Sequence, residues 1–268
     1  MNFLQFDFMR RALIASALVG LAAPAIGVFL VQRRLSLMGD GIGHLAFTGV
    51  AIGLLTSSSP LVMALIAAIS GALVIELLRA GNRASGEVAL AILLYGGIAG
   101  GVFVASLSQA PAAGLLSYLF GSVLTVTGGE LWAVAALSVS VLAISWALQK
   151  QLFAVSFDEE VARAAGLPVR TLNLLVAVTA AVTVVVAMRV VGLLLVAAMM
   201  VIPVAVVQPL CSNFRSTVRA SLAAGFGASV GGLVLAFYID SAPGPTIVLV
   251  SLVLFMVSAV GSRLRVAR

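Results

Sequence analysis

Charged residues are scarce in this sequence, and their scarcity excludes a water-soluble globular fold. Only 9% of the 268 residues are Asp, Glu, Lys or Arg, whereas soluble domains carry about 25%. Hydrophobic residues make up 62% of the chain, and the mean hydropathy is +1.23. The apolar residues form long unbroken runs, unlike the alternating pattern of a membrane β-barrel. The sequence therefore predicts an all-α, polytopic transmembrane helical bundle.

Cysteine, lysine and histidine each occur once, and this excludes several kinds of site. Cys211 alone forms no internal disulfide and no Cys-based zinc site. Lys150 follows Gln149, so the Gly-Lys-Ser/Thr sequence of an ATP-binding P-loop is absent. A single histidine supplies no H-E-x-x-H motif and no His-based triad together with a metal cluster. We therefore expect no enzyme active site and no permanently bound cofactor.

The basic residues explain the formal net charge of +6 without a nucleic-acid partner. They lie mostly at the ends of apolar runs, as the positive-inside rule expects. With these clusters in the cytoplasm, the C-terminus lies inside, and the N-terminus lies outside if there are nine spans and inside if there are eight. We expect no cleavable signal peptide, because no cleavage box follows the first apolar run. The basic clusters occupy residues 33–34, 79–83, 163–170, 215–219 and 263–268.

The apolar runs predict about eight or nine spans in a single domain over residues 1–268. The run at 45–55 is short, and it crosses only if the Gly-rich stretch before it also lies at membrane depth. The run at 115–127 is also short, and we expect a re-entrant or interfacial piece. Residues 157–166 predict a short amphipathic cytoplasmic helix, capped by Ser156 or Asp158. The longer runs are 13–31, 61–78, 88–107, 131–148, 171–187, 190–207, 221–238 and 246–260.

Asp40 and His44 form the most informative pair of ionisable residues. Four residues apart on a helix, their Cβ atoms lie about 6 Å from each other, so the pair suits a shared proton or a bound metal ion. An ionisable residue near the bilayer centre costs about 2.5–3.5 kcal/mol, and such residues usually have a function. Alternatively, Asp40 merely caps a helix that starts at Gly41. Glu76 lies one turn from Arg79, and pairing between these two side chains explains it.

Four stretches of the sequence are similar to motifs of one family. The first matches the pattern R-R-x-S-x-x-G-D-x-x-x-H. Together and in this order, the stretches resemble the ABC-3 family of metal-ion ABC transporter permeases, whose fold is related to that of the chelate-importer permeases. Gly41 and Gly43 depart from the family pattern, and they predict a looser segment before His44. The stretches are Arg33–His44, Tyr118–Leu124, Phe157–Gly166, and Val190–Pro203 with Asp240–Pro245.

The resemblance implies the membrane subunit of a metal importer in a bacterial plasma (inner) membrane. It implies a permease homodimer around a central path, two copies of a cytoplasmic ATPase that uses ATP, and an extracytoplasmic metal-binding protein. Asp40 and His44 match the metal path, where Zn²⁺ is the first candidate and Mn²⁺ the second. Asp240 either stabilises a turn or lies at the outer mouth of the path. Residues expected to couple the permease to the ATPase are Pro203, Arg215 and Arg219, and secondly Asp158, Glu159 and Arg163.

Two other functions remain open from the sequence. One is a permease for an iron-siderophore or cobalamin-type chelate, which would need a large apolar cavity without an acid and a histidine at its neck. The other is a proton-coupled secondary transporter that uses Asp40 and His44 as a proton relay. Uptake that collapses with an uncoupler but survives ATP depletion would select the secondary transporter.

Overall fold

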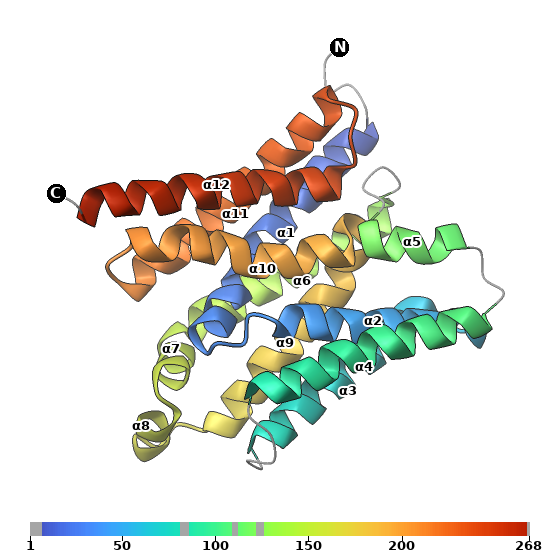
Figure 1. Cartoon of the computed structure of the whole chain (residues 1–268). Coiled ribbons are helices and arrows are strands. Elements are labelled where there is room, and N and C mark those ends of the chain that lie inside the picture. The colour runs from blue at the N-terminus through green and yellow to red at the C-terminus, as the bar shows by residue number, and fades with distance from the viewer. Residues whose placement is uncertain (1–6, 81–85, 109–111, 122–125, 267–268) are drawn as a thin grey trace.

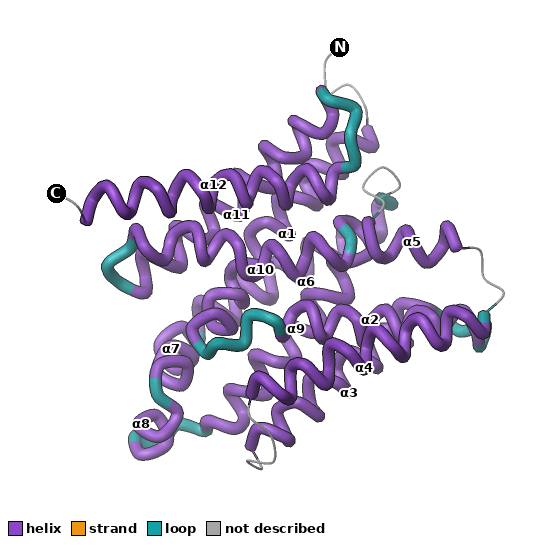
Figure 2. Tube along the Cα trace, in the orientation of Figure 1, coloured by secondary structure: helices purple, strands orange, loops and turns teal. Residues whose placement is uncertain are grey.

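The computed structural model describes residues 7–80, 86–108, 112–121 and 126–266, and these residues form helices joined by short connections (Figures 1 and 2). Parts of two predicted basic clusters, 79–83 and 263–268, lie outside the described residues. Within the described ranges, nine helices are long and apolar enough to cross a membrane, which confirms the all-α membrane bundle. They are α1 (Asp7–Gln32), α2 (Met38–Leu55), α3 (Pro60–Ala80), α4 (Gly86–Leu107), α6 (Gly128–Ala147), α9 (Val169–Val191), α10 (Leu193–Val207), α11 (Phe214–Tyr238) and α12 (Pro243–Val266).

Helix α2 shows how the short run at 45–55 becomes a span. The helix begins at Met38, so the Gly-rich stretch before residue 45 is helical and extends the span to 18 residues. Leu37 occupies the N-cap position without a side-chain hydrogen bond, and Asp40 lies inside the first turn. The alternative in which Asp40 caps a helix starting at Gly41 is therefore wrong. The start of α2 at Met38 could not be predicted from the sequence, because the glycines in this stretch are poor helix formers in isolation.

Four shorter helices complete the described chain: α5 (Ala112–Phe120), α7 (Gln149–Phe157), α8 (Glu159–Ala164) and the 3₁₀ helix Gln208–Leu210. The short helix predicted within residues 157–166 is α8, and Asp158, one of the two expected caps, caps it, whereas Phe157 ends α7. Asp158 Oδ1 accepts hydrogen bonds from the backbone N–H groups of Glu160 (2.9 Å) and Val161 (3.0 Å), which makes it the N-cap of α8. Helix α5 has nine residues and is too short to cross; residues 122–125 of the run at 115–127 lie outside the described ranges.

Two glycines with positive φ bring the end of α5 against the turn between α9 and α10. Gly121 has φ +76° and Gly192 has φ +89°, a backbone region that favours glycine. A Cβ atom placed on Gly192 would lie 2.6 Å from the backbone nitrogen of Gly121. The two backbones therefore pack directly on each other, and this contact fixes α5 beside the α9–α10 turn.

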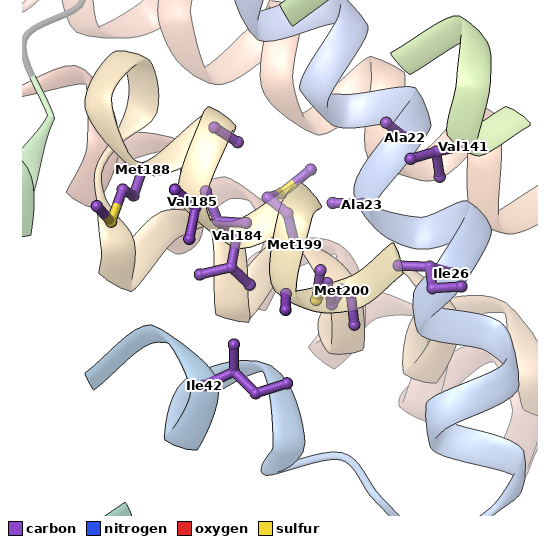
Figure 3. Close-up of a cluster of buried hydrophobic side chains, with 14 of the residues drawn as sticks. Ala22, Ala23, Ile26, Ile42, Val141, Val184, Val185, Met188, Met199 and Met200 are labelled. Atoms are coloured by element: carbon purple, nitrogen blue, oxygen red, sulfur yellow. The ribbon is translucent and has the colours of Figure 1, made fainter. Parts of the chain in front are cut away.

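The core lies where α1, α2, α9 and α10 meet, as Figure 3 shows for side chains from these helices. Met188 of α9 and Met199 and Met200 of α10 are nearly fully buried in this cluster, where flexible methionine side chains fill irregular spaces. Ile26 of α1 and Ile42 of α2 pack into the same cluster. In contrast, α4, α6 and α12 are mostly exposed and carry apolar outer faces. These outer faces suit contact with lipid or with a partner chain.

Candidate functional site

Asp40 and His44 lie in the first two turns of α2, as the sequence predicts. His44 Nε2 is 3.6 Å from Asp40 Oδ1, and the two side chains are 18% and 33% exposed, respectively. Both side chains therefore remain accessible on a face of α2 that the rest of the chain leaves partly open. No third His, Cys, Asp or Glu joins them to form a metal-binding group within the described ranges. One chain thus offers one carboxylate and one imidazole at this place.

Tight packing against α4 fixes the backbone that carries His44. Thr48 Oγ1 donates hydrogen bonds to the carbonyl oxygens of His44 (3.1 Å) and Gly97 (2.8 Å), and so joins α2 to α4. A Cβ atom on Gly97 would lie 2.8 Å from Leu45 N and 2.9 Å from His44 C. Only a glycine therefore allows α4 to approach this turn of α2 so closely.

The glycines within α2 also serve close packing, on the side facing α9 and α10. A Cβ atom on Gly43 would overlap the Leu193 side chain, and one on Gly39 would lie 2.9 Å from Met200 Sδ. The expected looser segment before His44 is therefore a helix packed on several sides. Gly41 is packed closely as well, on the side of α4, since a Cβ atom there would lie 2.8 Å from Leu93 Cδ2.

Replacing Gly97 with alanine tests this packing. The added methyl group must push α4 away from His44, at a cost of about 1–3 kcal/mol typical of overpacking. We expect a lower thermal midpoint for the detergent-solubilised protein. Gly96 is the matched control, because a Cβ atom there meets nothing within 4 Å. The packing account is contradicted if Gly96→Ala destabilises the protein as much as Gly97→Ala does.

A second polar cluster lies beside the connection between α1 and α2. Glu159 Oε1 accepts a hydrogen bond from Arg33 Nη2 at 2.8 Å and another from Asn173 Nδ2 at 3.1 Å. Arg79 Nη1 pairs with Glu76 Oε2 at 3.2 Å, which confirms the predicted pair, and Arg79 Nη2 lies 3.9 Å from Glu159 Oε1. These side chains come from the α1–α2 connection, α3, α8 and α9. The cluster therefore joins α8 to the segment that leads into α2.

Arg33 is the most buried charge of this cluster, with a side chain that is 4% exposed. Desolvation by burial, followed by the nearby charge of Arg79, lowers the pKa of the Arg33 guanidinium, whereas the carboxylates of Glu76 and Glu159 raise it. The sequence predicts Arg33 in a cytoplasmic basic cluster. No spacing rule predicts that it pairs with a residue 126 positions away. Only the folded structure shows that Arg33 pairs with Glu159.

The structure separates the other residues that the sequence singles out. Pro203 is buried inside α10, whereas Arg215 and Arg219 are exposed near the start of α11. Arg163 is exposed on α8. Asp240 is exposed in the turn after α11, with φ +52°, a conformation that aspartate tolerates in turns. Within the described residues it forms no metal-binding group with Asp40 and His44.

In the described part of the chain, nine candidate spans define a multi-pass membrane protein, and an accessible acid–histidine pair on one span is typical of a transport path. A family model described as the ABC 3 transport family matches residues 5–262. The chain therefore belongs to the ABC 3 transport family, which confirms the resemblance drawn from its motifs.

Several relatives that match along more than nine-tenths of the chain carry names that refer to metal transport. The manganese import system permease protein ScaB of Streptococcus gordonii is 30% identical over 253 residues, which cover 94% of this chain and 91% of that protein. A probable metal transport system membrane protein of Treponema pallidum is 34% identical over 254 residues, covering 94% and 95%. Among solved structures, PsaBC from Streptococcus pneumoniae in complex with Fab matches with a TM-score of 0.84 and 30% identity, covering 95% of this chain and 91% of that one.

Proposed function

We propose that this chain is the membrane-spanning subunit of an ATP-driven importer that passes Mn²⁺ into a bacterial cytoplasm. The observation that carries the proposal is the accessible Asp40–His44 pair on a span of an ABC 3 family permease. Carboxylate oxygen and imidazole nitrogen suit both Mn²⁺ and Zn²⁺. The names of the relatives favour manganese, which therefore replaces zinc as our first candidate substrate. Zn²⁺ is the second candidate.

A homodimer would complete the site that one chain leaves incomplete. Asp40 and His44 supply two donor groups, whereas transition-metal sites use four or more ligands. A two-fold axis beside the open face of α2 would bring two carboxylates and two imidazoles to one path. Such a site is occupied transiently, because transport requires that the bound ion can leave. An extracytoplasmic metal-binding protein would deliver the ion to the outer end of the path.

We place the ATPase contact on α7 and α8, which lie beside the ends of α1 and α9 in Figure 1. Phe157 is 74% exposed and Val161 is 65% exposed, so this short segment presents two large apolar side chains to its surroundings. Arg163 lies exposed on the same helix. Asp158 shapes the segment by capping α8, and Glu159 anchors it to Arg33. Two ATPase copies would bind the two permeases of the dimer.

Reconstitution tests this function. The permease and its ATPase, in proteoliposomes with the metal-binding protein outside, should take up radioactive manganese when ATP is present on the ATPase side. We expect uptake to continue in the presence of an uncoupler, because ATP rather than a proton gradient supplies the energy. Uptake that needs no ATP and collapses with the uncoupler would instead establish a secondary transporter. Uptake of a metal chelate but not of the free ion would establish a chelate permease.

A further inference from the structure

A basic groove lies between α6, α7 and α11, with α1 as its floor. Its volume is about 700 Å³, and Lys150, Arg215 and Arg219 line it. An adjoining hollow of about 560 Å³ shares Lys150 and Arg215, so the basic surface continues along the start of α11. No acidic residue lines either hollow. The groove thus concentrates three positive charges without a negative one.

These charges differ from the neutralised cluster around Arg33. Among the described residues, no carboxylate lies within ion-pair distance of Lys150, Arg215 or Arg219. Three basic side chains without a carboxylate partner suit an anion with several acceptor oxygens.

The position of the groove indicates where this anion comes from. Helix α6 ends at Ala147 and α11 begins at Phe214, so the groove lies at one boundary of the spans, which the positive-inside rule assigns to the cytoplasm. Trp146 borders it and is 83% exposed, which is typical of a side chain at the membrane interface. The floor is apolar and includes Phe29 and Leu222. A groove with basic walls, an apolar floor and an opening beside an interfacial tryptophan suits a lipid.

The groove lies away from the Asp40–His44 pair. Helices α6 and α11 both pack on α1, whereas α2 packs mainly on α3 and α4. In Figure 1, α10 and α12 pass in front of α1 and α11. A molecule in the groove would therefore contact neither member of the pair.

We propose that this groove binds the phosphate group of an anionic phospholipid from the cytoplasmic leaflet. Arg215, Arg219 and Lys150 contact the phosphate oxygens, and the lipid glycerol and acyl chains lie along Leu222 and Trp146. Basic pockets between transmembrane helices on the cytoplasmic side are suited to lipid head groups of this charge. The ligand would hold α11 and α6 at a fixed distance across α1.

The fluorescence of Trp146 tests this proposal, because Trp132 is the only other tryptophan. In a Trp132→Phe background, the permease is placed in phosphatidylcholine nanodiscs that contain a small, equal fraction of brominated phosphatidylglycerol or brominated phosphatidylcholine. We expect the anionic lipid to quench Trp146 more strongly. Each Arg→Gln change at 215 or 219 should lower the preference about fivefold. Arg219→Lys keeps the charge and should keep most of the preference.

Arg163→Gln is the matched control, since it removes an exposed arginine on α8 outside the groove and should leave the preference unchanged. Equal quenching by both lipids would overturn the proposal. If both lipids quench equally and inorganic phosphate changes the Trp146 emission more than sodium chloride of equal ionic strength does, the ligand is a free phosphate and the proposal fails. Arg215→Gln and Arg219→Gln proteins that lose the ATPase while keeping the lipid preference would show that the groove binds the ATPase instead.

Discussion

Replacing Asp40 with asparagine should lower ATP-driven manganese uptake by at least about tenfold, which is the smallest loss expected when a group that shapes a metal site is removed. Asparagine has nearly the same size as aspartate, so the change removes a charged ligand without opening a cavity. His44→Ala should lower uptake at least as much, because it removes the imidazole completely. The measurement is the initial rate of radioactive manganese uptake in proteoliposomes, normalised to the amount of permease.

Asp7→Asn is the matched control for this prediction. Asp7 is 86% exposed at the start of α1 and pairs only loosely, at 3.9 Å, with Arg10. The Asp7→Asn variant should take up manganese at the wild-type rate, since exposed ion pairs contribute little to the stability of a protein. Wild-type uptake by Asp40→Asn and His44→Ala proteins at normal abundance would remove the pair from the transport path.

Replacing Glu159 with alanine should destabilise the protein by about 3 kcal/mol, the low end of the range for breaking a buried ion pair. The Arg33 side chain is 4% exposed and would lose its 2.8 Å partner while staying buried. The low end applies because Glu159 itself is 37% exposed and Glu76 still attracts Arg33. We expect the thermal midpoint of the solubilised protein to fall by about 5–10 °C.

Glu160→Ala provides the comparison for this change, because Glu160 is the adjacent, exposed acid on the same helix. It removes the same charge from α8 and should shift the midpoint by no more than about 1–2 °C, as surface substitutions do. Equal shifts for the two variants would mean that the Arg33–Glu159 contact does not stabilise the fold. An Arg33→Ala, Glu159→Ala double variant should lose less than the two single variants together.

Much of the fold could be predicted from the sequence, because hydrophobic run length is a strong signal for membrane helices. The weak point was the start of α2. Its glycines predicted a looser segment, yet Gly43 and Gly39 lie against Leu193 and Met200 within a packed helix. Helix propensity describes an isolated segment, and here the tight packing of neighbouring helices overrides it.

Only part of the candidate site could be predicted from the sequence, because the contacts differ in how far apart their residues lie along the chain. Asp40 and His44 lie within one helix, so their spacing alone predicts that they meet. Arg33 and Glu159 meet only after α1 and α8 have packed, and no local pattern encodes that contact. The cap at Asp158 was predictable, because it is a contact between residues two and three positions apart. Polar contacts between residues far apart in the chain were therefore the hardest to predict from the sequence.

The central claim is that the metal ion contacts Asp40 and His44 as it crosses the membrane. Pulsed electron paramagnetic resonance of Mn²⁺ bound to the tag-free permease in nanodiscs tests it most directly, because His44 is the only histidine in the chain. Any imidazole-nitrogen modulation of the manganese signal must then come from His44. We predict that this modulation is present in the wild-type protein and absent after His44→Asn. A bound manganese signal without imidazole modulation, or a modulation that persists in His44→Asn, would contradict the account.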